Sequence, residues 1–304
     1  LSLIGNISVA GNWEYIQGNI DPLSSSVFFY TNNKFIDCQG TSQTMEFYNA
    51  ALGDGNRRTL QGEMIVQNQL DLGIGNIDLN TFDISILNSA TTGIIRQNNG
   101  YVISETQPGV GLGRIVWNIR NGVVGDDYVI PFGVNNLNII PYEYTIQIAG
   151  TESGIGSIAF STYPTSTSNN PNNRPFPTGV TTFDDYLNQE FAPEALDRFW
   201  IVEPQNYSVP PQGEMLFTYL DAEWGGANNN ITAGIEPDLK PVRWEGPYWD
   251  IPYPATVDAV NNEVNSTVAI DDYAEFTLTT IPIPDVDFSD PGPVCIGDCV
   301  DFSD

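Results

Sequence analysis

Short apolar runs, separated by segments rich in Asn, Gly, Ser, Thr and Pro, follow one another along nearly the whole chain. The runs are rich in Val, Ile, Phe and Tyr and alternate with polar residues, which is typical of short β-strands. A helical period is nearly absent, and residues 181–199 are the one segment where we expect a short helix. The pattern therefore predicts an all-β protein.

Residues 1–125 are predicted to form a β-solenoid, similar to a parallel β-helix. Strand-length segments recur at roughly 15–20 residues, too short a repeat for each to bury its own apolar face, so stacked rungs are favoured. Alternation places one aliphatic set inward, namely Met64, Val66, Leu70, Leu72, Ile77 and Leu79. Polar residues turn outward or cap corners, namely Asn68, Asp71 and Asn76. A sandwich stays open as an alternative because the spacing drifts.

Residues 126–282 have longer segments in which Phe, Tyr and Leu alternate with polar residues. This texture predicts an antiparallel β-sandwich. The prolines in residues 281–286 indicate an extended linker, since each fixes its own φ and keeps its predecessor out of the helical region. We therefore assign residues 283–304 to a linker and the first strands of another unit.

Several motifs follow one another in a family-like order: GNISVAGNWEYIQGNIDPLSSSVFFYTNN, MEFYNAAL, MIVQNQLDLGIGNIDL, YVIPFGV, RFWIV, LFTYLDAEW and LKPVRWEGPYWD. This order resembles the large surface proteins of the Bacteroidota that the type IX secretion system exports, including gliding and attachment adhesins. The resemblance covers most of residues 6–282. It departs at Pro131 and Phe132, where the family usually has Phe-Pro. It implies a protein of the cell surface with an adhesive role.

The tail PDVDFSDPGPVCIGDCVDFSD resembles the start of a PKD-type immunoglobulin-like domain. Such a domain needs roughly 80–100 residues, so the resemblance implies further modules downstream in the native polypeptide. Outside the cell, Cys295 and Cys299 are candidates for a disulfide, either with each other or with a later cysteine. Cys38 stands alone, and we expect it to be a small buried residue.

The chain is strongly acidic, with 38 Asp and Glu, 10 Lys and Arg and a net charge of −28. Nucleic acid and anionic membrane surfaces are therefore excluded as expected partners. The charge is concentrated in residues 151–304, which carry 25 acidic and 4 basic side chains. We interpret this acidity as a means of keeping the protein soluble, with cation binding as the alternative interpretation. No run of 18 apolar residues exists, so we expect no membrane-spanning segment.

The sequence contains no histidine. Ser-His-Asp and Cys-His systems are thereby excluded in their usual form, as is imidazole ligation of a metal. Carboxylate pairs of a glycosidase stay open, but no motif marks one. With Lys34 and Lys240 as its lysines, the chain also has few bases for a polysaccharide lyase. We therefore expect no enzyme.

Two binding hypotheses remain, and each has a structural alternative. Calcium prefers carboxylate, amide and carbonyl oxygens; the structural Ca²⁺ candidates are Asp54, Asn56, Asp287, Asp290, Asp298 and Asp301. Their alternative is a role in turns and on a solvated acidic surface. Aromatic faces stack on sugar rings; the glycan-binding candidates are Trp244, Tyr248, Trp249 and Tyr253. Their alternative is packing in the core.

Together these observations predict a non-enzymatic, extracellular adhesive or structural module of a very large bacterial surface protein. No cofactor is expected beyond calcium. Solenoid edges suit side-by-side pairing, so we expect a homo-oligomer or filament, joined to downstream modules. The alternative is a carbohydrate-binding or carbohydrate-active module of a secreted protein.

Overall fold

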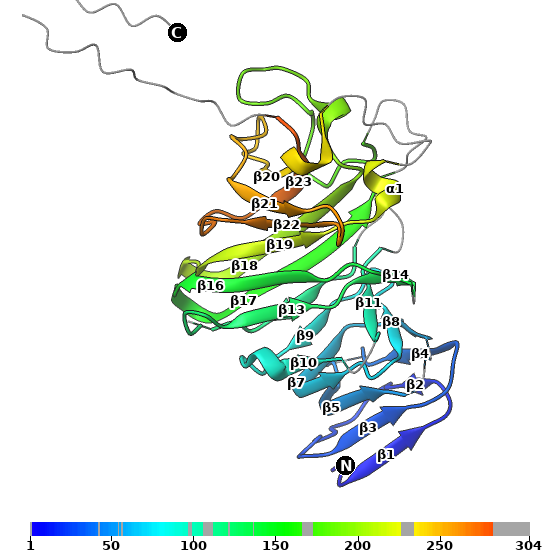
Figure 1. Ribbon diagram of the computed structural model, residues 1–304. Coiled ribbons are helices and arrows are strands. Elements are labelled where there is room, and N and C mark those ends of the chain that lie inside the picture. Colours follow the sequence, from blue (N-terminus) through cyan, green and yellow to red (C-terminus); the bar gives the residue numbers. More distant parts are fainter. Residues whose placement is uncertain are drawn as a thin grey trace, which may run out of the picture.

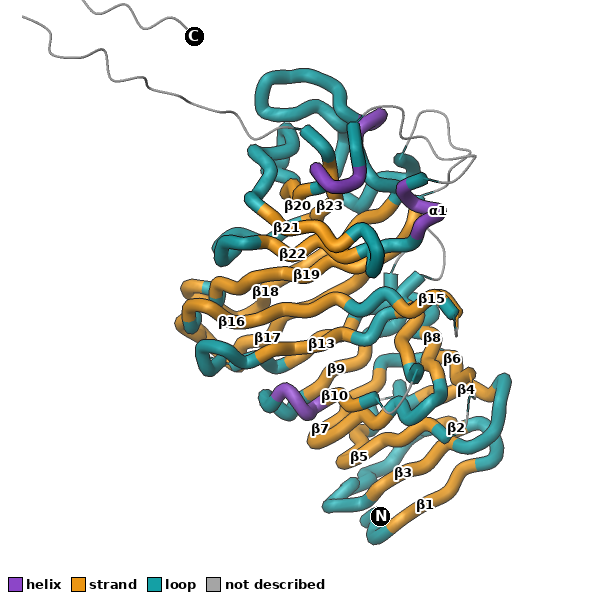
Figure 2. Tube along the Cα trace, viewed as in Figure 1, coloured by secondary structure: helices purple, strands orange, loops and turns teal. Residues whose placement is uncertain are grey.

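The computed structural model describes residues 2–41, 43–53, 55, 57–96, 99–105, 112–120, 122–135, 137–165, 173–225 and 234–281. Across these residues, 23 β-strands form the body of the molecule (Figure 2). The helices among them are short: α1 (Asp221–Trp224), η1 (Thr91–Gly93), η2 (Ala192–Glu194) and η3 (Glu236–Asp238). The all-β prediction is confirmed.

In the N-terminal half, the chain alternates between two sheets of parallel strands, in a solenoid-like arrangement (Figure 1). One sheet contains β1 (Asn6–Val9), β3 (Ser26–Phe29), β5 (Glu46–Leu52), β7 (Met64–Asp71), β9 (Ile84–Ile86) and β12 (Ile115–Trp117), with β10 (Ile94–Ile95) beside β7. The other contains β11 (Tyr101–Ile103), β8 (Asn76–Asp78), β6 (Arg57–Leu60), β4 (Lys34–Asp37) and β2 (Trp13–Glu14). The first rungs advance by 20 to 23 residues, as the pairs Ile7–Val27 and Val27–Ala50 show.

The predicted inward set lies inside this stack. Met64, Val66, Leu70, Leu72, Ile77 and Leu79 are each at most 1% exposed. Asn68 and Asp71 are partly exposed, in line with outward positions. Asn76 differs, because it is buried, with Arg57 of β6 and Tyr101 of β11 as its register partners on either side.

The first sheet does not end with the parallel strands. β12 pairs in parallel with β9 and antiparallel with β17 (Thr151–Pro164), and the sheet then continues through β18 (Arg198–Val209), β23 (Glu275–Thr279) and β20 (Lys240–Arg243). An antiparallel sheet lies against it, formed by β13 (Asp127–Ile130), β16 (Tyr142–Ile148), β19 (Gln212–Thr218), β22 (Glu263–Ser266) and β21 (Ala255–Asp258). A small hairpin joins β14 (Gly133–Asn135) to β15 (Asn138–Ile139).

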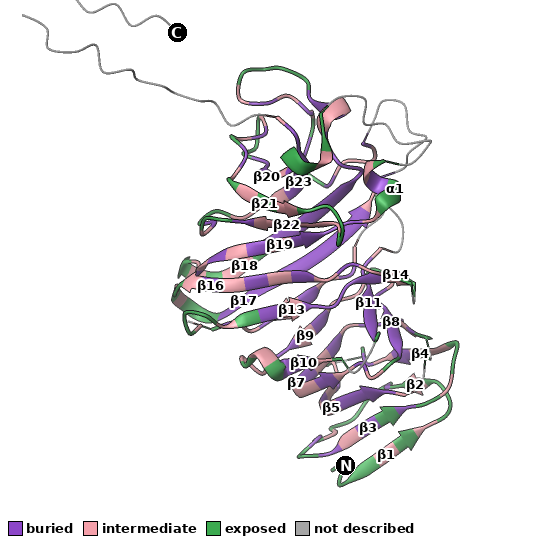
Figure 3. Ribbon diagram, viewed as in Figure 1, coloured by how far each residue is buried: buried purple, intermediate pink, exposed green. Residues whose placement is uncertain are grey.

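One hydrophobic core runs through the parallel and antiparallel parts (Figure 3). Trp200 of β18 meets Phe217 of β19 edge to face, with ring centroids 5.1 Å apart, and Tyr142 of β16 lies 5.6 Å from Phe160 of β17. These contacts join two sheets face to face, as in a sandwich. The expected boundary between residues 125 and 126 falls between β12 and β13, and both the long sheet and the core continue past it.

The opposite, outer face of the long sheet carries a second hydrophobic cluster. Residues from the segment 173–196 cover this face, and the rings of Phe183 and Phe199 stack on Trp249 at 13° and 18°. Because successive strand residues point to opposite faces, Phe199 and Ile201 join this cluster while Trp200 faces the main core.

The short helix expected within residues 181–199 is reduced to the three-residue 3-10 helix η2, and no α-helix forms there. Asp185 Oδ1 accepts hydrogen bonds from the backbone N–H groups of Leu187 and Gln189. Asn188 has a φ of 59°. A carboxylate that bonds the backbone two residues on stabilises a turn instead of a helix. The 3-10 turn η2 follows, and β18 then begins at Arg198.

Candidate ligand-binding cleft

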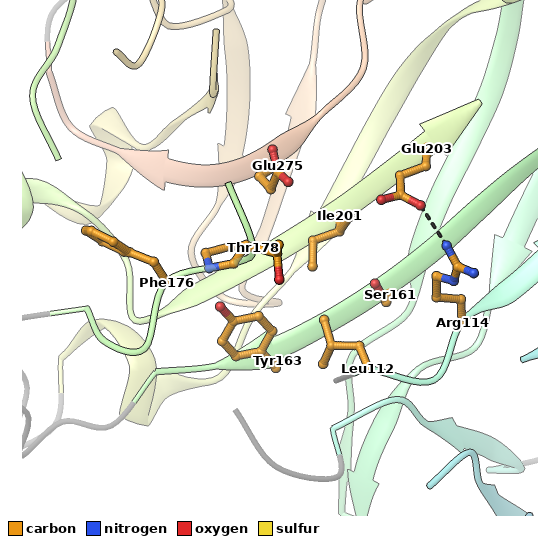
Figure 4. Close-up of a pocket in the computed structure, with 10 residues that line it drawn as sticks. Leu112, Arg114, Ser161, Tyr163, Phe176, Thr178, Ile201, Glu203 and Glu275 are labelled. Carbon is orange, nitrogen blue, oxygen red and sulfur yellow. Dashed lines mark hydrogen bonds and ion pairs between the residues drawn. The ribbon is translucent and has the colours of Figure 1, made fainter. Parts of the chain in front are cut away.

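A cleft of about 350 Å³ opens on the outer face of the long sheet, beside the second hydrophobic cluster (Figure 4). Its floor is formed by Ser161, Tyr163, Ile201, Glu203 and Glu275. Its rim is formed by Leu112 and Arg114 on one side and by residues 176–178 on the other. A concave site of this size, with apolar walls and a few convergent polar groups, is typical of small-ligand binding.

Strand register brings the floor residues together. Ser161 of β17 pairs with Ile201 of β18, and Ile201 pairs with Glu275 of β23, so the three form one row across the sheet. Glu203 lies two residues along β18 from Ile201 and therefore points to the same face. The intervening residue, Val202, faces the main core.

Arg114 forms the charged rim and links the solenoid-like region to β18. Its Nη2 lies 2.6 Å from Asp83 Oδ2, and its Nη1 lies 2.8 Å from Glu203 Oε2. The hydrogen bonds to Asp83 raise the pKa of the Arg114 guanidinium further above its ordinary value. Asp83 and Glu203 therefore share one permanent positive charge.

Glu275 lies at the other end of the row, partly buried. Burial raises the pKa of its carboxyl group, and the negative charge of Glu203 adds to the increase, while a hydrogen bond from its own backbone N–H acts against it. Within the described part of the chain, no lysine or arginine forms an ion pair with this carboxylate. The floor thus carries a negative charge without a cationic partner.

Ser161 supplies a polar group between the two ends. Its side chain is 2% exposed, and its Oγ has no hydrogen-bond partner among the described residues. Buried polar groups are almost always hydrogen-bonded, so an orphaned hydroxyl in the floor of a cleft points to a ligand.

The aromatic residues of the cleft have their ring faces occupied. Tyr163 is 1% exposed, and its hydroxyl donates to the Pro175 carbonyl at 2.9 Å. The guanidinium carbon of Arg174 lies 3.3 Å from the centroid of the Phe176 ring, and Phe183 packs at 5.4 Å. The walls therefore offer apolar contact without an open aromatic platform.

The structure does not gather the four predicted glycan-binding aromatics on an open surface. Trp249 is 0% exposed, and its Nε1 donates to the Thr182 carbonyl at 2.9 Å. Trp244 is 5% exposed, with its ring centroid 5.4 Å from that of Trp249. Both indoles pack in the second cluster, where their faces contact protein. Tyr248 and Tyr253 are partly exposed.

The predicted calcium and disulfide residues lie outside the described residues: Asp54, Asn56, Asp287, Asp290, Asp298, Asp301, Cys295 and Cys299. The PKD-like segment 283–304 lies outside them as well. In the described ranges, no group of three His, Cys, Asp or Glu side chains is placed to hold a metal ion. Cys38 is a free, buried thiol as expected, and burial raises its pKa far above the ordinary value.

None of the floor residues stands out in the sequence. Ser161, Glu203 and Glu275 each occupy one position of an alternating strand, where a polar side chain normally faces water. The one available signal is that Glu203 directly follows the apolar run Phe199–Val202. It becomes informative only when the sheet register is known.

Comparisons of the chain with models of protein families, with curated proteins and with solved structures found no match. Among the residues that the structure describes, no helix combines the length and the apolar character needed to cross a bilayer. Function must therefore be argued from the architecture and from the cleft.

Proposed function

We propose that this chain is a non-enzymatic, extracellular adhesive and structural module of a large cell-surface protein. The observation that carries the proposal is the unbroken long sheet. It runs from β1 at one end of the elongated body to β23 and β20 at the other (Figure 1). Because neighbouring strands are about 4.8 Å apart, each further strand lengthens the body. The sides of the body and its loops are then available for contact.

Self-association belongs to the proposal. Among the described strands, β1 pairs with β3 on one side, which leaves its other edge open. Ile7 and Val9 of β1 are only partly buried, whereas Val27 and Phe29 of the next rung are fully buried. Solenoid ends normally need a cap, and an open edge is a template for pairing. A second copy covering this end would start a homo-oligomer or filament.

The residues beyond the described range keep their proposed role. Residues 283–304 belong to the proposal as the first strands of a PKD-type module. A mass measurement with and without reductant tests the accompanying disulfide. A mass 2 Da lower without reductant, as loss of two hydrogens requires, supports a bond between Cys295 and Cys299 within this chain, whereas two free thiols contradict it.

Attachment is tested with fluorescent microspheres coated with the folded chain and exposed to bacterial cells and abiotic surfaces under flow. We expect retention of the coated spheres. Spheres coated with heat-unfolded protein are the control, since they carry the same composition and charge. Equal retention of both coats would show that adhesion does not depend on this fold.

Assembly is tested by analytical ultracentrifugation. We expect species larger than a monomer, and we expect Ile4→Lys and Ile16→Lys to shift the distribution toward monomer because these side chains, 79% and 61% exposed, lie at the β1 end. Leu137→Lys is the control, since Leu137 is 93% exposed but belongs to the β14–β15 hairpin. A monomer at every concentration would end the assembly part of the proposal.

A carbohydrate-active or carbohydrate-binding module is the second candidate. It is supported by two carboxylates in one cleft, of which Glu275 has a raised pKa and Glu203 is paired with Arg114. Glycosidases use such a division between acid and base. Release of reducing ends from a polysaccharide panel, abolished in Glu275→Gln, would favour this candidate over the first.

A further inference from the structure

We propose that the cleft binds a primary ammonium group, presented either by a lysine side chain of a partner protein or by an amino sugar. The proposal rests on the binding role of this module proposed above and names the ligand class of its cleft. Three observations support it: the charge balance of the floor, the unpartnered Ser161 hydroxyl, and the nature of the walls.

The net negative charge of the cleft favours a cationic ligand. Arg114 brings one positive charge to the lining of the cleft, and Glu203 and Glu275 bring two negative ones, while Arg114 is also shared with Asp83 outside the lining. Arg114 is held at the Asp83 end, and Glu275 lies at the far end of the row. A partly buried carboxylate without a counter-charge is costly, so a cation beside it lowers the free energy of the bound state.

The acceptors suit an ammonium group. An ammonium group has three N–H donors and no acceptor. Glu203 and Glu275 face the same side of the sheet from neighbouring strands, close enough for the charge of Glu203 to raise the pKa of Glu275. Ser161 lies across Ile201 from Glu275. Ser161 is 2% exposed, and its Oγ has no hydrogen-bond partner among the described residues. This unpartnered hydroxyl is an independent sign that the floor binds a polar ligand.

The walls favour an ammonium ligand over a neutral sugar. Neutral sugars are usually held by stacking on an open aromatic face, but Tyr163 is buried and Phe176 is covered by Arg174. Leu112 and Ile201 instead offer aliphatic contact. A lysine places four methylenes along such a surface while its charge reaches the carboxylates.

Isothermal titration calorimetry on the whole chain, at about 0.15 M salt to screen the acidic surface, tests the proposal. The probes are Nα-acetyl-lysine amide and glucosamine, each with a neutral partner, norleucine amide and N-acetylglucosamine. We expect one-to-one binding of at least one ammonium probe and none of its neutral partner. The lysine probe alone identifies a protein partner, and glucosamine alone identifies an amino sugar.

Variants locate the binding. We expect Glu275→Gln to weaken binding at least about tenfold, because the ammonium group then faces a neutral amide oxygen instead of a charged carboxylate. Ser161→Ala should weaken it several-fold while leaving the melting temperature unchanged or higher. Glu14→Gln removes the same charge from an exposed residue at the other end of the molecule, and it should bind like the parent.

Three results would overturn the proposal: equal binding of charged and neutral probes, full binding by Glu275→Gln, and no binding of either ammonium probe. If Glu275→Gln does not fold, Ser161→Ala decides. The microsphere experiment reads attachment whatever the ligand. A failed titration with intact attachment therefore removes only the ammonium site, and lost attachment with intact titration removes only the adhesive role.

Discussion

Arg198 places a positive charge between two buried carboxylates, those of Glu105 and Glu223. Its side chain is fully buried, its Nε and Nη2 donate to Glu223 at 2.8 Å and 2.6 Å, and its Nη1 donates to Thr162 at 2.9 Å and to Glu105. The residue thus holds α1 and the segment after β11 onto β17 and β18.

Arg198→Met should destabilise the fold by about 3–5 kcal/mol, because Glu105 and Glu223 would keep buried charges without a cation. Urea denaturation measures the loss. Arg114→Met is the comparison, since the Arg114 side chain is 36% exposed and its ion pairs should contribute about 1 kcal/mol or less. A loss for Arg198→Met no larger than for Arg114→Met would contradict the interpretation.

Substitutions in the segment 244–253 distinguish aromatic residues that pack in the core from those that could bind a ligand. Trp249→Ala should cost about 3–5 kcal/mol of stability, because it removes a buried ring that stacks on both Phe183 and Phe199. Tyr248→Ala, at a partly exposed position of the same loop, should cost well under half of that. Comparable losses in thermal melts would show that Trp249 is not the packing centre of the cluster.

At the scale of elements, period-two alternation predicts the strands well, because one buried face selects aliphatic residues such as Leu70 and Ile77. Within residues 181–199 only the short 3-10 helix η2 forms instead of an α-helix, because hydrogen bonds to the Asp185 carboxylate compete with helical ones. The cleft is not predictable from pattern. Register alone places Ser161 beside Ile201, and register depends on the whole sheet.

The corners of the solenoid-like region make their own prediction. Gly73 has a φ of +52°, and an added Cβ would lie 2.7 Å from the Leu52 carbonyl oxygen of the rung below. Gly55 has a φ of +63°, but an added Cβ there meets nothing within 4 Å. Gly55→Ala should cost about 1–2 kcal/mol for its left-handed backbone. Gly73→Ala should cost at least about 1 kcal/mol more, because the clash is with backbone. Equal losses in urea would contradict this account.

For the whole molecule, the dominant property is acidity, and it predicts how stability depends on pH. Burial raises the pKa values of Glu63, Glu105, Glu143, Glu263 and Glu275. Between the ordinary glutamate pKa and these raised values, the folded protein binds more protons than the unfolded chain. The free energy of unfolding therefore falls as pH rises through that window.

We therefore expect a higher melting temperature at about pH 5 than at about pH 7, measured at constant ionic strength. Glu63→Gln, Glu143→Gln and Glu275→Gln combined should flatten the profile, while Glu14→Gln, at an exposed site, should not. A melting temperature that falls on this mild acidification would show that other groups dominate the linkage.

β12 pairs with a solenoid rung on one side and with β17 on the other. Because of this, the number of rungs can change without any change in the antiparallel part. A rung inserted or deleted before β9 leaves the cleft and its sheet register unchanged. It moves the cleft by about 4.8 Å relative to the β1 end. The distance between the β1 end and the cleft can therefore change in steps of one strand, while the residues that line the cleft stay the same.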